Sequence, residues 1–90
     1  MADDWVEQQF TVARELGLHA RPSGMLVTLA AGFQAEIEIG RDGEWVSGSS
    51  VLSILSLAAT RGTPLGVRAR GADARAAVEA MGAIIAATGD

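Results

Sequence analysis

The residue types that could do chemistry meet in one short segment of this 90-residue chain. Residues 17–22 read Gly-Leu-His-Ala-Arg-Pro and contain the single histidine, His19, two positions before Arg21. An uncharged imidazole nitrogen is a nucleophile that can attack phosphorus, and a guanidinium is a planar, permanently charged partner for phosphate oxygens. A phosphorus bond to imidazole is more reactive than a serine phosphate ester. The segment therefore predicts a site that accepts a phosphoryl group and passes it on.

Pro22 indicates that this segment enters a helix. Proline suits the first helical turn, because the N–H that it lacks would have no intrahelical partner there. His19 is then at or near the N-cap, and the backbone N–H groups of Ala20 and Arg21 point outward. The helix dipole favours an anion at such an exposed position by roughly 0.3 to 1 kcal/mol. We expect Ala20 and Arg21 to form a cradle for phosphate without a metal.

A plainer interpretation is that His19 caps the helix or packs beside Leu18. Its combination with Gly17, Arg21 and Pro22 at a helix start favours the phosphoryl site. A Ser-His-Asp hydrolase is a formal alternative, but the chain contains no Gly-x-Ser-x-Gly pattern to support it.

The composition argues against several other kinds of chemistry. The chain has no Cys and one His, so we expect no metal site and no cofactor. All seven basic residues are Arg, so the Lys of a Walker-type nucleotide loop is missing. Eleven acidic residues give a net charge of −4, which disfavours nucleic acid as a partner. An RNA-binding module would also need aromatic platforms on its strands, and none is visible.

The length and the N-terminus set the expected organisation and location. Ninety residues with 49% apolar content can bury one core, so we expect a single domain over residues 1–90. The start Met-Ala-Asp-Asp-Trp lacks the features of a secretory signal, and no apolar stretch is long enough to span a bilayer. We expect a cytoplasmic protein without membrane insertion. A carrier that docks through one face is most simply a monomer.

Hydrophobic periodicity predicts the elements around His19. Alternation over Val6 to Ala13 indicates a half-buried strand, followed by a loop from Arg14 to Leu18. A helix begins at about Ala20, and Gly32 stands where a helix-ending glycine is expected. The apolar positions of this helix with 3.6-residue spacing are Met25, Leu26, Leu29, Ala30 and Phe33.

Three more strands are predicted after the first helix. They cover Gln34 to Ile39, Glu44 to Ser47, and Pro64 to Arg70. Asp42-Gly43 is the signal of a tight hairpin between the first two of these, and Gly62 closes the turn before the third.

Two more helices complete the order βαββαβα. Ser49 and Ser50 can cap a short helix from Val51 to about Ala58, and Asp73 can cap a last helix that ends before Gly89. The inward stripe of the last helix is predicted to be Ala74, Ala77, Val78, Met81, Ile84 and Ile85. Strands with alternating faces and amphipathic helices predict a two-layer α/β sandwich.

The short helix carries more apolar side chains than its size can hide. Val51, Ile54, Leu55 and Ala58 fall near one face, whereas Leu52 projects elsewhere. An exposed apolar patch can mark a docking surface, and the alternative is ordinary core packing with one stray Leu. The residues by themselves do not separate these two interpretations.

Residues 17–22 resemble the active-site signature of HPr, the histidine-containing phosphocarrier family of the bacterial phosphoenolpyruvate-dependent phosphotransferase system, which includes nitrogen-type NPr relatives. The similarity runs from about Gln9 to Met81 without a required gap. It includes Gly32-Phe33, the Ser50 helix and the Thr-Arg-Gly-Thr of residues 60–63.

The resemblance implies a fold and a role. The fold is an α+β, open-faced β-sandwich with a four-stranded antiparallel sheet in the order 1-4-2-3 and three helices on one face. The implied role is a stoichiometric phosphoryl carrier rather than an enzyme. His19 would be phosphorylated on Nδ1 by enzyme I, Arg21 would assist, and IIA components would accept the group.

The resemblance also implies two further sites. Family members dock on both kinds of partner through one surface, which here comprises Ala20, Gly24, Val51, Leu52 and Leu55. This favours the docking interpretation of the short helix. Ser50 occupies the position of a regulatory serine, which an HPr kinase/phosphorylase modifies in many bacteria. The alternative is that Ser50 is an ordinary N-cap serine.

The chain departs from the family pattern where several members carry Lys on the docking surface. Thr28, Ala31, Ser49 and Ser53 stand at those positions. We therefore expect weaker electrostatic steering toward acidic partners and consider the nitrogen-type regulatory branch beside sugar uptake. The alternative is a non-transport regulatory binding protein that acts through the Ser50 helix, but such relatives lose the active histidine and this chain has His19.

Overall fold

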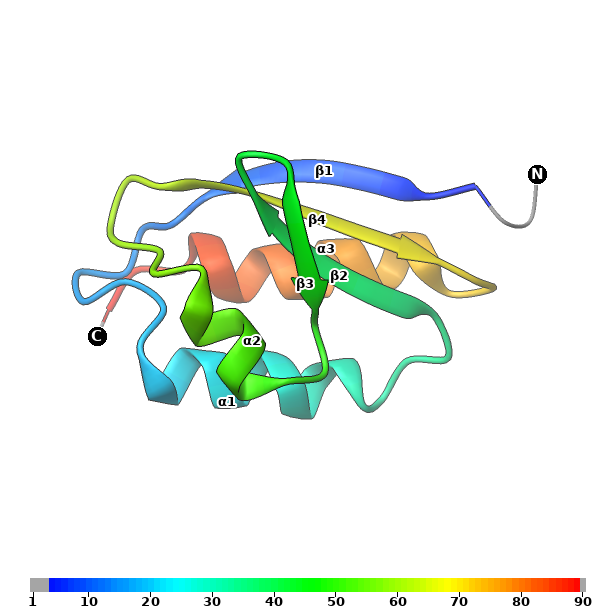
Figure 1. Ribbon diagram of the computed structural model, residues 1–90. Coiled ribbons are helices and arrows are strands. Elements are labelled where there is room, and N and C mark those ends of the chain that lie inside the picture. The colour runs from blue at the N-terminus through cyan, green and yellow to red at the C-terminus, as the bar shows by residue number, and fades with distance from the viewer. Residues whose placement is uncertain (1–3, 90) are drawn as a thin grey trace.

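Within residues 4–89, four strands and three helices follow one another in the predicted order βαββαβα. The computed structural model describes residues 4–89 (Figure 1). The strands are β1 Val6–Thr11, β2 Glu36–Arg41, β3 Glu44–Ser47 and β4 Pro64–Arg70. The helices are α1 Ala20–Ala30, α2 Val51–Ser56 and α3 Ala74–Ala86.

The four strands form one antiparallel sheet in the order β1-β4-β2-β3, which confirms the order that the family resemblance implies. Strand β4 is therefore internal and pairs with β1 on one side and β2 on the other. Between β2 and β3, Asp42 and Gly43 both have positive φ angles, of 54° and 83°. Two such residues between paired strands make the tight turn that Asp-Gly predicts.

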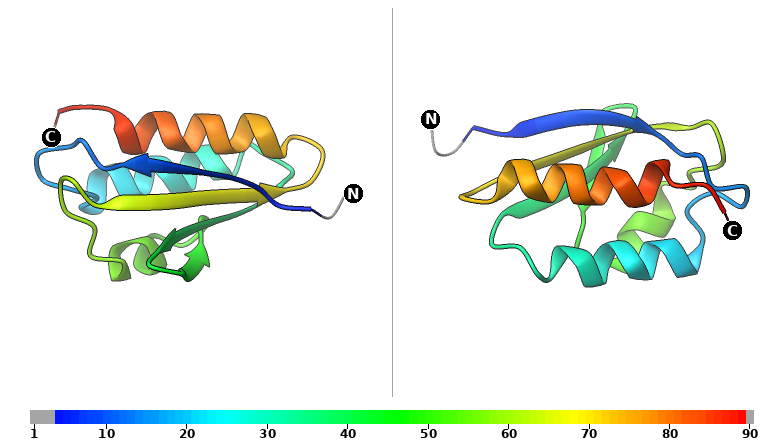
Figure 2. Two further views of the ribbon diagram at one scale, coloured as in Figure 1. Left: turned by 90° about the horizontal axis from the view of Figure 1, so that it is seen from above. Right: turned by 180° about the vertical axis from the view of Figure 1, so that it is seen from behind.

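The helices cover one face of this sheet and enclose the core. Helix α3 packs against β1, β4 and β2, while α1 packs against α3 and α2 (Figures 1 and 2). Leu65, Val67 and Ala69 point from β4 into the core and are fully buried. The predicted α3 stripe is buried with one exception, Ile84, which is half-buried.

The opposite face of the sheet is covered by its own side chains. The indole of Trp45 lies over Gly40 and Gly66, where a Cβ atom would collide with the ring. The guanidinium of Arg68 stacks between Trp5 and Trp45, at 4.4 and 4.2 Å from the ring centroids. An Arg68–Glu38 ion pair of 2.6 Å adds to these stacks, so the guanidinium of Arg68 is held on this face by both kinds of contact.

The first two strands differ from their predicted bounds. Strand β1 ends at Thr11 rather than Ala13, because Val12 donates to the Thr63 carbonyl and Ala13 donates across to Ile85 on α3. Strand β2 begins two residues later than predicted, at Glu36 rather than Gln34.

Asp73 explains the late start of β2 and corrects its predicted role. It is the N-cap residue of α3, but its carboxylate makes no capping bond to that helix. Instead the carboxylate accepts the backbone N–H of Gln34 at 2.9 Å and of Ala35 at 2.8 Å. These two hydrogen bonds, Gln34 first, lower the pKa of Asp73. The side chain therefore fastens the segment between α1 and β2.

Three helix predictions also need correction. Helix α2 ends at Ser56, because Ala58 has a left-handed φ of 51° and is exposed instead of lying on the packed face. Gly32 follows α1 but does not have a positive φ, and the C-cap Ala31 is right-handed. Met25 fits the apolar spacing of α1 and is nevertheless 43% exposed.

Candidate phosphoryl-transfer site

His19 is the N-cap residue of α1, as its position before Pro22 predicts. Its backbone is extended, with φ −74° and ψ −169°, and its carbonyl accepts the first helical hydrogen bond, from Ser23 at 3.1 Å. The N–H groups of Ala20 and Arg21 precede that bond, so they lie at the positive end of the helix dipole. The structure thus brings together His19, Ala20 and Arg21 at one helix end.

The two nitrogens of the imidazole ring have different surroundings. Nδ1 accepts the Arg21 N–H at 3.4 Å, whereas Nε2 is buried and has no hydrogen-bond partner among residues 4–89. In a neutral imidazole one nitrogen carries the hydrogen and the other accepts. Because Nδ1 accepts, the hydrogen belongs on Nε2. The lone pair of Nδ1 lies beside the helix N-terminus, and this is the nitrogen that can act as a nucleophile.

Gly17 determines the backbone conformation of the loop that leads to His19. Its φ is +70°, a left-handed conformation that favours glycine, and a Cβ atom there would collide with the Ala59 carbonyl oxygen. The same carbonyl accepts the Leu18 N–H at 3.0 Å. The segment behind α2 therefore supports the residue directly before His19.

Two polar side chains that the sequence interpretation did not single out also hold this loop. Ser23 is fully buried, and its hydroxyl donates to the Leu18 carbonyl at 3.1 Å. Arg14 is 6% exposed, and its Nε donates to the Ile84 carbonyl of α3 at 3.2 Å. A serine one position after Pro22 at a helix start was the available signal for Ser23, whereas the contact of Arg14 spans 70 residues and leaves no local pattern.

The residues expected to dock partners are exposed or half-buried on α1 and α2. Leu52 is 79% exposed and Ala20 is exposed, while Gly24, Val51 and Leu55 are half-buried. In contrast, Ile54 of α2 is fully buried. Because α1 and α2 pack together (Figure 1), these residues belong to adjoining segments, and α1 begins directly after His19.

Two further apolar side chains extend this exposed set. Leu16 is 66% exposed in the loop before His19, and Met25 is 43% exposed one turn into α1. Together with Leu52 they are the large hydrophobic side chains exposed in the described part of the chain. Helical spacing assigned Met25 to the core, and an apolar residue in a loop, Leu16, was the signal that the sequence interpretation did not use. Exposed apolar groups around a reactive side chain favour protein docking.

Ser50 is the N-cap of α2, as predicted. Its hydroxyl oxygen accepts the Ser53 N–H at 3.2 Å, and the residue is half-buried. Of the positions where Lys is missing, Thr28, Ala31 and Ser49 are exposed and Ser53 is half-buried. Ser50 therefore lies on the same helix as the exposed Leu52.

Within residues 4–89 the acidic and histidine side chains form no cluster suited to a metal ion. In that same part of the chain, every helix is too short or too polar to cross a membrane.

Comparison with known proteins shows what this site is similar to. The profile described as "PTS HPr component phosphorylation site" matches residues 6–87. The phosphocarrier protein NPr of Shewanella violacea is 39% identical over 85 residues, which cover 94% of this chain and 93% of that protein. The phosphocarrier protein HPr of Cupriavidus necator is 33% identical over 81 residues, covering 90% and 91%. The crystal structure of an HPr from Bacillus anthracis superposes with a TM-score of 0.87 at 35% identity and covers 92% of this chain and 99% of that chain.

The open-faced sandwich and the histidine at the start of α1 define a small phosphocarrier domain rather than a catalytic enzyme. With profile, sequence and structure in agreement, the chain belongs to the HPr family of the phosphotransferase system, which includes both HPr and NPr proteins.

Proposed function

We propose that this protein accepts a phosphoryl group from phosphorylated enzyme I on Nδ1 of His19 and donates it to IIA components. The observation that carries the proposal is the ring geometry. Nδ1 accepts a backbone N–H at the start of α1, while Nε2 is turned into the protein. An attacking lone pair and a binding place for the transferred anion therefore coincide.

The transfer exchanges one bond to phosphorus for another. The Nδ1 lone pair of His19 forms a bond to phosphorus as the bond between phosphorus and the donor breaks, and that electron pair stays with the donor. The phosphoryl oxygens then accept hydrogen bonds from the N–H groups of Ala20 and Arg21, and the Arg21 N–H no longer donates to Nδ1. The Arg21 guanidinium balances their negative charge. The same steps in reverse order deliver the group to an acceptor.

Partners of both kinds would use the exposed groups beside His19. Ala20, Gly24, Val51, Leu52 and Leu55 form the proposed docking surface, and their exposure supports it. Because donor and acceptor use one surface, the protein cannot bind both at once. It therefore works as a shuttle between them, and a monomer is sufficient for this role. Such exchange takes place in the cytoplasm.

Ser50 is the proposed regulatory site, modified by an HPr kinase/phosphorylase where the bacterium has one. A phosphate on its hydroxyl would remain at the N-terminus of α2, where the dipole tolerates it. It would also place negative charge beside Leu52, which is 79% exposed. Docking of partners should therefore weaken.

The salt dependence of the association rate bears on whether the protein serves sugar uptake or nitrogen-type regulation. The docking surface lacks Lys at residues 28, 31, 49 and 53, so steering by charge should be weak and the association rate should vary little with ionic strength. This supports a nitrogen-type regulatory role beside sugar uptake. A steep fall of the association rate with added salt would contradict it.

Mass spectrometry after incubation with phosphoenolpyruvate and a bacterial enzyme I tests the proposal. We expect one acid-labile phosphoryl group on the wild type and none on His19→Ala. The variant Arg75→Gln, on the exposed side of α3, is the control for folding and should be labelled like the wild type. Absence of labelling with a cognate enzyme I would refute the carrier function and favour a regulatory binding protein that acts through the Ser50 helix.

A further inference from the structure

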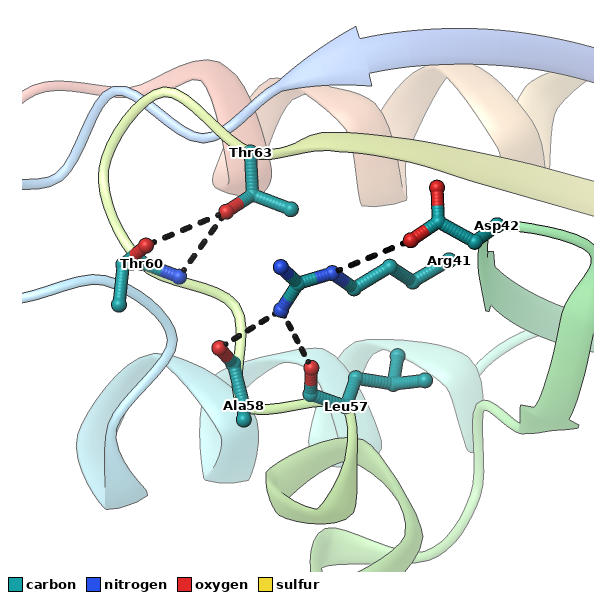
Figure 3. A network of polar contacts seen from close by, with 6 residues as sticks. All are labelled: Arg41, Asp42, Leu57, Ala58, Thr60 and Thr63. Atoms are coloured by element: carbon teal, nitrogen blue, oxygen red, sulfur yellow. Dashed lines mark hydrogen bonds and ion pairs between the residues drawn. The ribbon is translucent and has the colours of Figure 1, made fainter.

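Arg41 links the β2–β3 hairpin to the end of α2. It is the last residue of β2, and its Nη1 donates to the carbonyl oxygens of Leu57 and Ala58, both at 2.9 Å (Figure 3). The last carbonyls of a helix have no intrahelical partner, and a cation near them is favourable. A helix of six residues has little stability of its own, so this external cap matters more here than in a longer helix.

The residues that Arg41 holds lead directly to the site. Ala58 has a left-handed φ of 51°, which turns the chain sharply behind α2. The next carbonyl, of Ala59, accepts the Leu18 N–H at 3.0 Å, and it lies where Gly17 has no room for a side chain. Leu18 immediately precedes His19. Residues 57–59 thus connect the guanidinium of Arg41 to the backbone directly before His19.

Further contacts hold both ends of this connection. Arg41 pairs with Glu44 across the tight turn, and its Nε lies 3.9 Å from the Asp42 carboxylate. Beyond Ala59, the Thr60 N–H and hydroxyl both contact the hydroxyl oxygen of Thr63, at 3.1 and 3.3 Å (Figure 3). An element held at both ends transmits a change at one end to the groups that it supports in between.

We propose that Arg41 is a positioning residue for phosphoryl transfer. It fixes residues 57–59 so that the Ala59 carbonyl holds Leu18, and with it His19, in the orientation that presents Nδ1. This inference rests on the proposed carrier function. Loss of the guanidinium weakens the end of α2 and loosens the support of the His19 ring. With enzyme I, kcat should therefore fall by a larger factor than KM rises.

Steady-state phosphorylation by enzyme I provides the first measurement. Arg41→Met keeps the aliphatic stem and removes the donors, and we expect kcat to fall about three- to tenfold, the effect of losing one or two ordinary hydrogen bonds. Arg41→Lys retains a donor and should recover part of the rate. Arg68→Met is the matched control, because it removes an equally well bonded arginine from the opposite face of the sheet. Its kcat should equal that of the wild type.

Hydrogen exchange of the Leu18 amide is the second measurement and needs no enzyme I. Exchange should accelerate in Arg41→Met and not in Arg68→Met. An unchanged kcat in Arg41→Met, an equal fall in both variants, or unchanged Leu18 exchange would overturn the proposal. If the wild type itself is not phosphorylated, the carrier function fails, and the exchange measurement still decides whether Arg41 holds Leu18.

Discussion

Helices α1 and α3 both start at a residue whose side chain can accept backbone N–H groups, and the two side chains are used differently. The Asp73 carboxylate at α3 turns away from its own helix and accepts two N–H groups of the segment before β2, at 2.9 and 2.8 Å. The His19 imidazole at α1 stays over its own helix and makes one long contact of 3.4 Å.

The difference separates a structural helix start from a reactive one. Two short hydrogen bonds keep the Asp73 carboxylate ionised and occupied, because a protonated carboxyl group would lose them. A single long contact leaves the lone pair of Nδ1 at His19 ready to be exchanged for a phosphoryl group. The same helix position therefore favours binding within the chain at α3, and at α1 it suits the phosphoryl transfer that we propose for His19.

Replacement of His19 and of Asp73 by asparagine should give the largest difference in phosphorylation between two variants. His19→Asn keeps a capping side chain on α1, so the melting temperature should change little, but no phosphoryl group should be accepted. Asp73→Asn should be phosphorylated at the wild-type rate. Labelling by enzyme I and thermal unfolding of both variants check this, and any acid-labile label on His19→Asn would place the reactive nitrogen elsewhere.

Gly17→Ala tests whether the approach to α1 is as constrained as the structure indicates. Its left-handed φ and the collision with the Ala59 carbonyl should together cost about 2 to 4 kcal/mol of unfolding free energy. Denaturant unfolding measures this cost. Gly43→Ala is the control for backbone strain alone, because its φ is 83° but its Cβ would meet no atom within 4 Å. Equal losses in both variants would show that the contact with Ala59 does not matter.

Ser50→Asp tests a third helix start, that of α2. The Ser50 hydroxyl caps its own helix and is also the proposed site of a regulatory phosphate. Aspartate caps a helix as well as serine, so α2 should persist, but the added charge beside Leu52 should slow phosphorylation by enzyme I by about tenfold. Ser50→Asn provides the same cap without the charge and should keep the wild-type rate. If the two variants slow transfer equally, the hydroxyl rather than the charge is what docking requires.

The smallest effect is expected from the titration of Asp73. Its pKa is lower in the folded protein than the ordinary value of 3.8, so the ionised carboxylate stabilises the fold fully above that value. The contribution is lost as the pH falls below 3.8 and through the lower pKa of the folded state. The gap in melting temperature between wild type and Asp73→Asn should therefore narrow in acid. Glu79→Gln, exposed on the same helix, serves as the control.

Much of the fold and the centre of the site could be predicted because they depend on local backbone preferences. Pro22 predicts the start of α1 and hence the N-cap position of His19. Asp42-Gly43 predicts the turn between β2 and β3, and alternation from Pro64 to Arg70 predicts β4 with its observed bounds. Each of these signals lies within a few residues of the feature that it predicts.

The remaining features depend on partners that are distant in sequence. Asp73 looks like an ordinary cap, and only the placement of the residue 34–35 backbone beside it directs the carboxylate away from α3. Met25 has core spacing and becomes exposed because α1 packs against α3 and α2 through its other side chains. The short α2 ends at Ser56, before the left-handed Ala58, and the guanidinium of Arg41 reaches the carbonyls of residues 57 and 58 from strand β2.

The sequence by itself determined the family and the order of the elements. It also indicated His19 as the candidate phosphoryl acceptor, because a motif of six neighbouring residues predicts a helix start and its chemistry together. Only the tertiary structure decided which nitrogen of His19 faces the helix N-terminus and what supports the residues before it. The support of Leu18 comes from Ala59, which is far away in the sequence, and the ring contact of His19 with the Arg21 N–H is local but depends on the orientation of the ring in the folded protein. A side chain with several available partners bonds to the one that packing brings within reach.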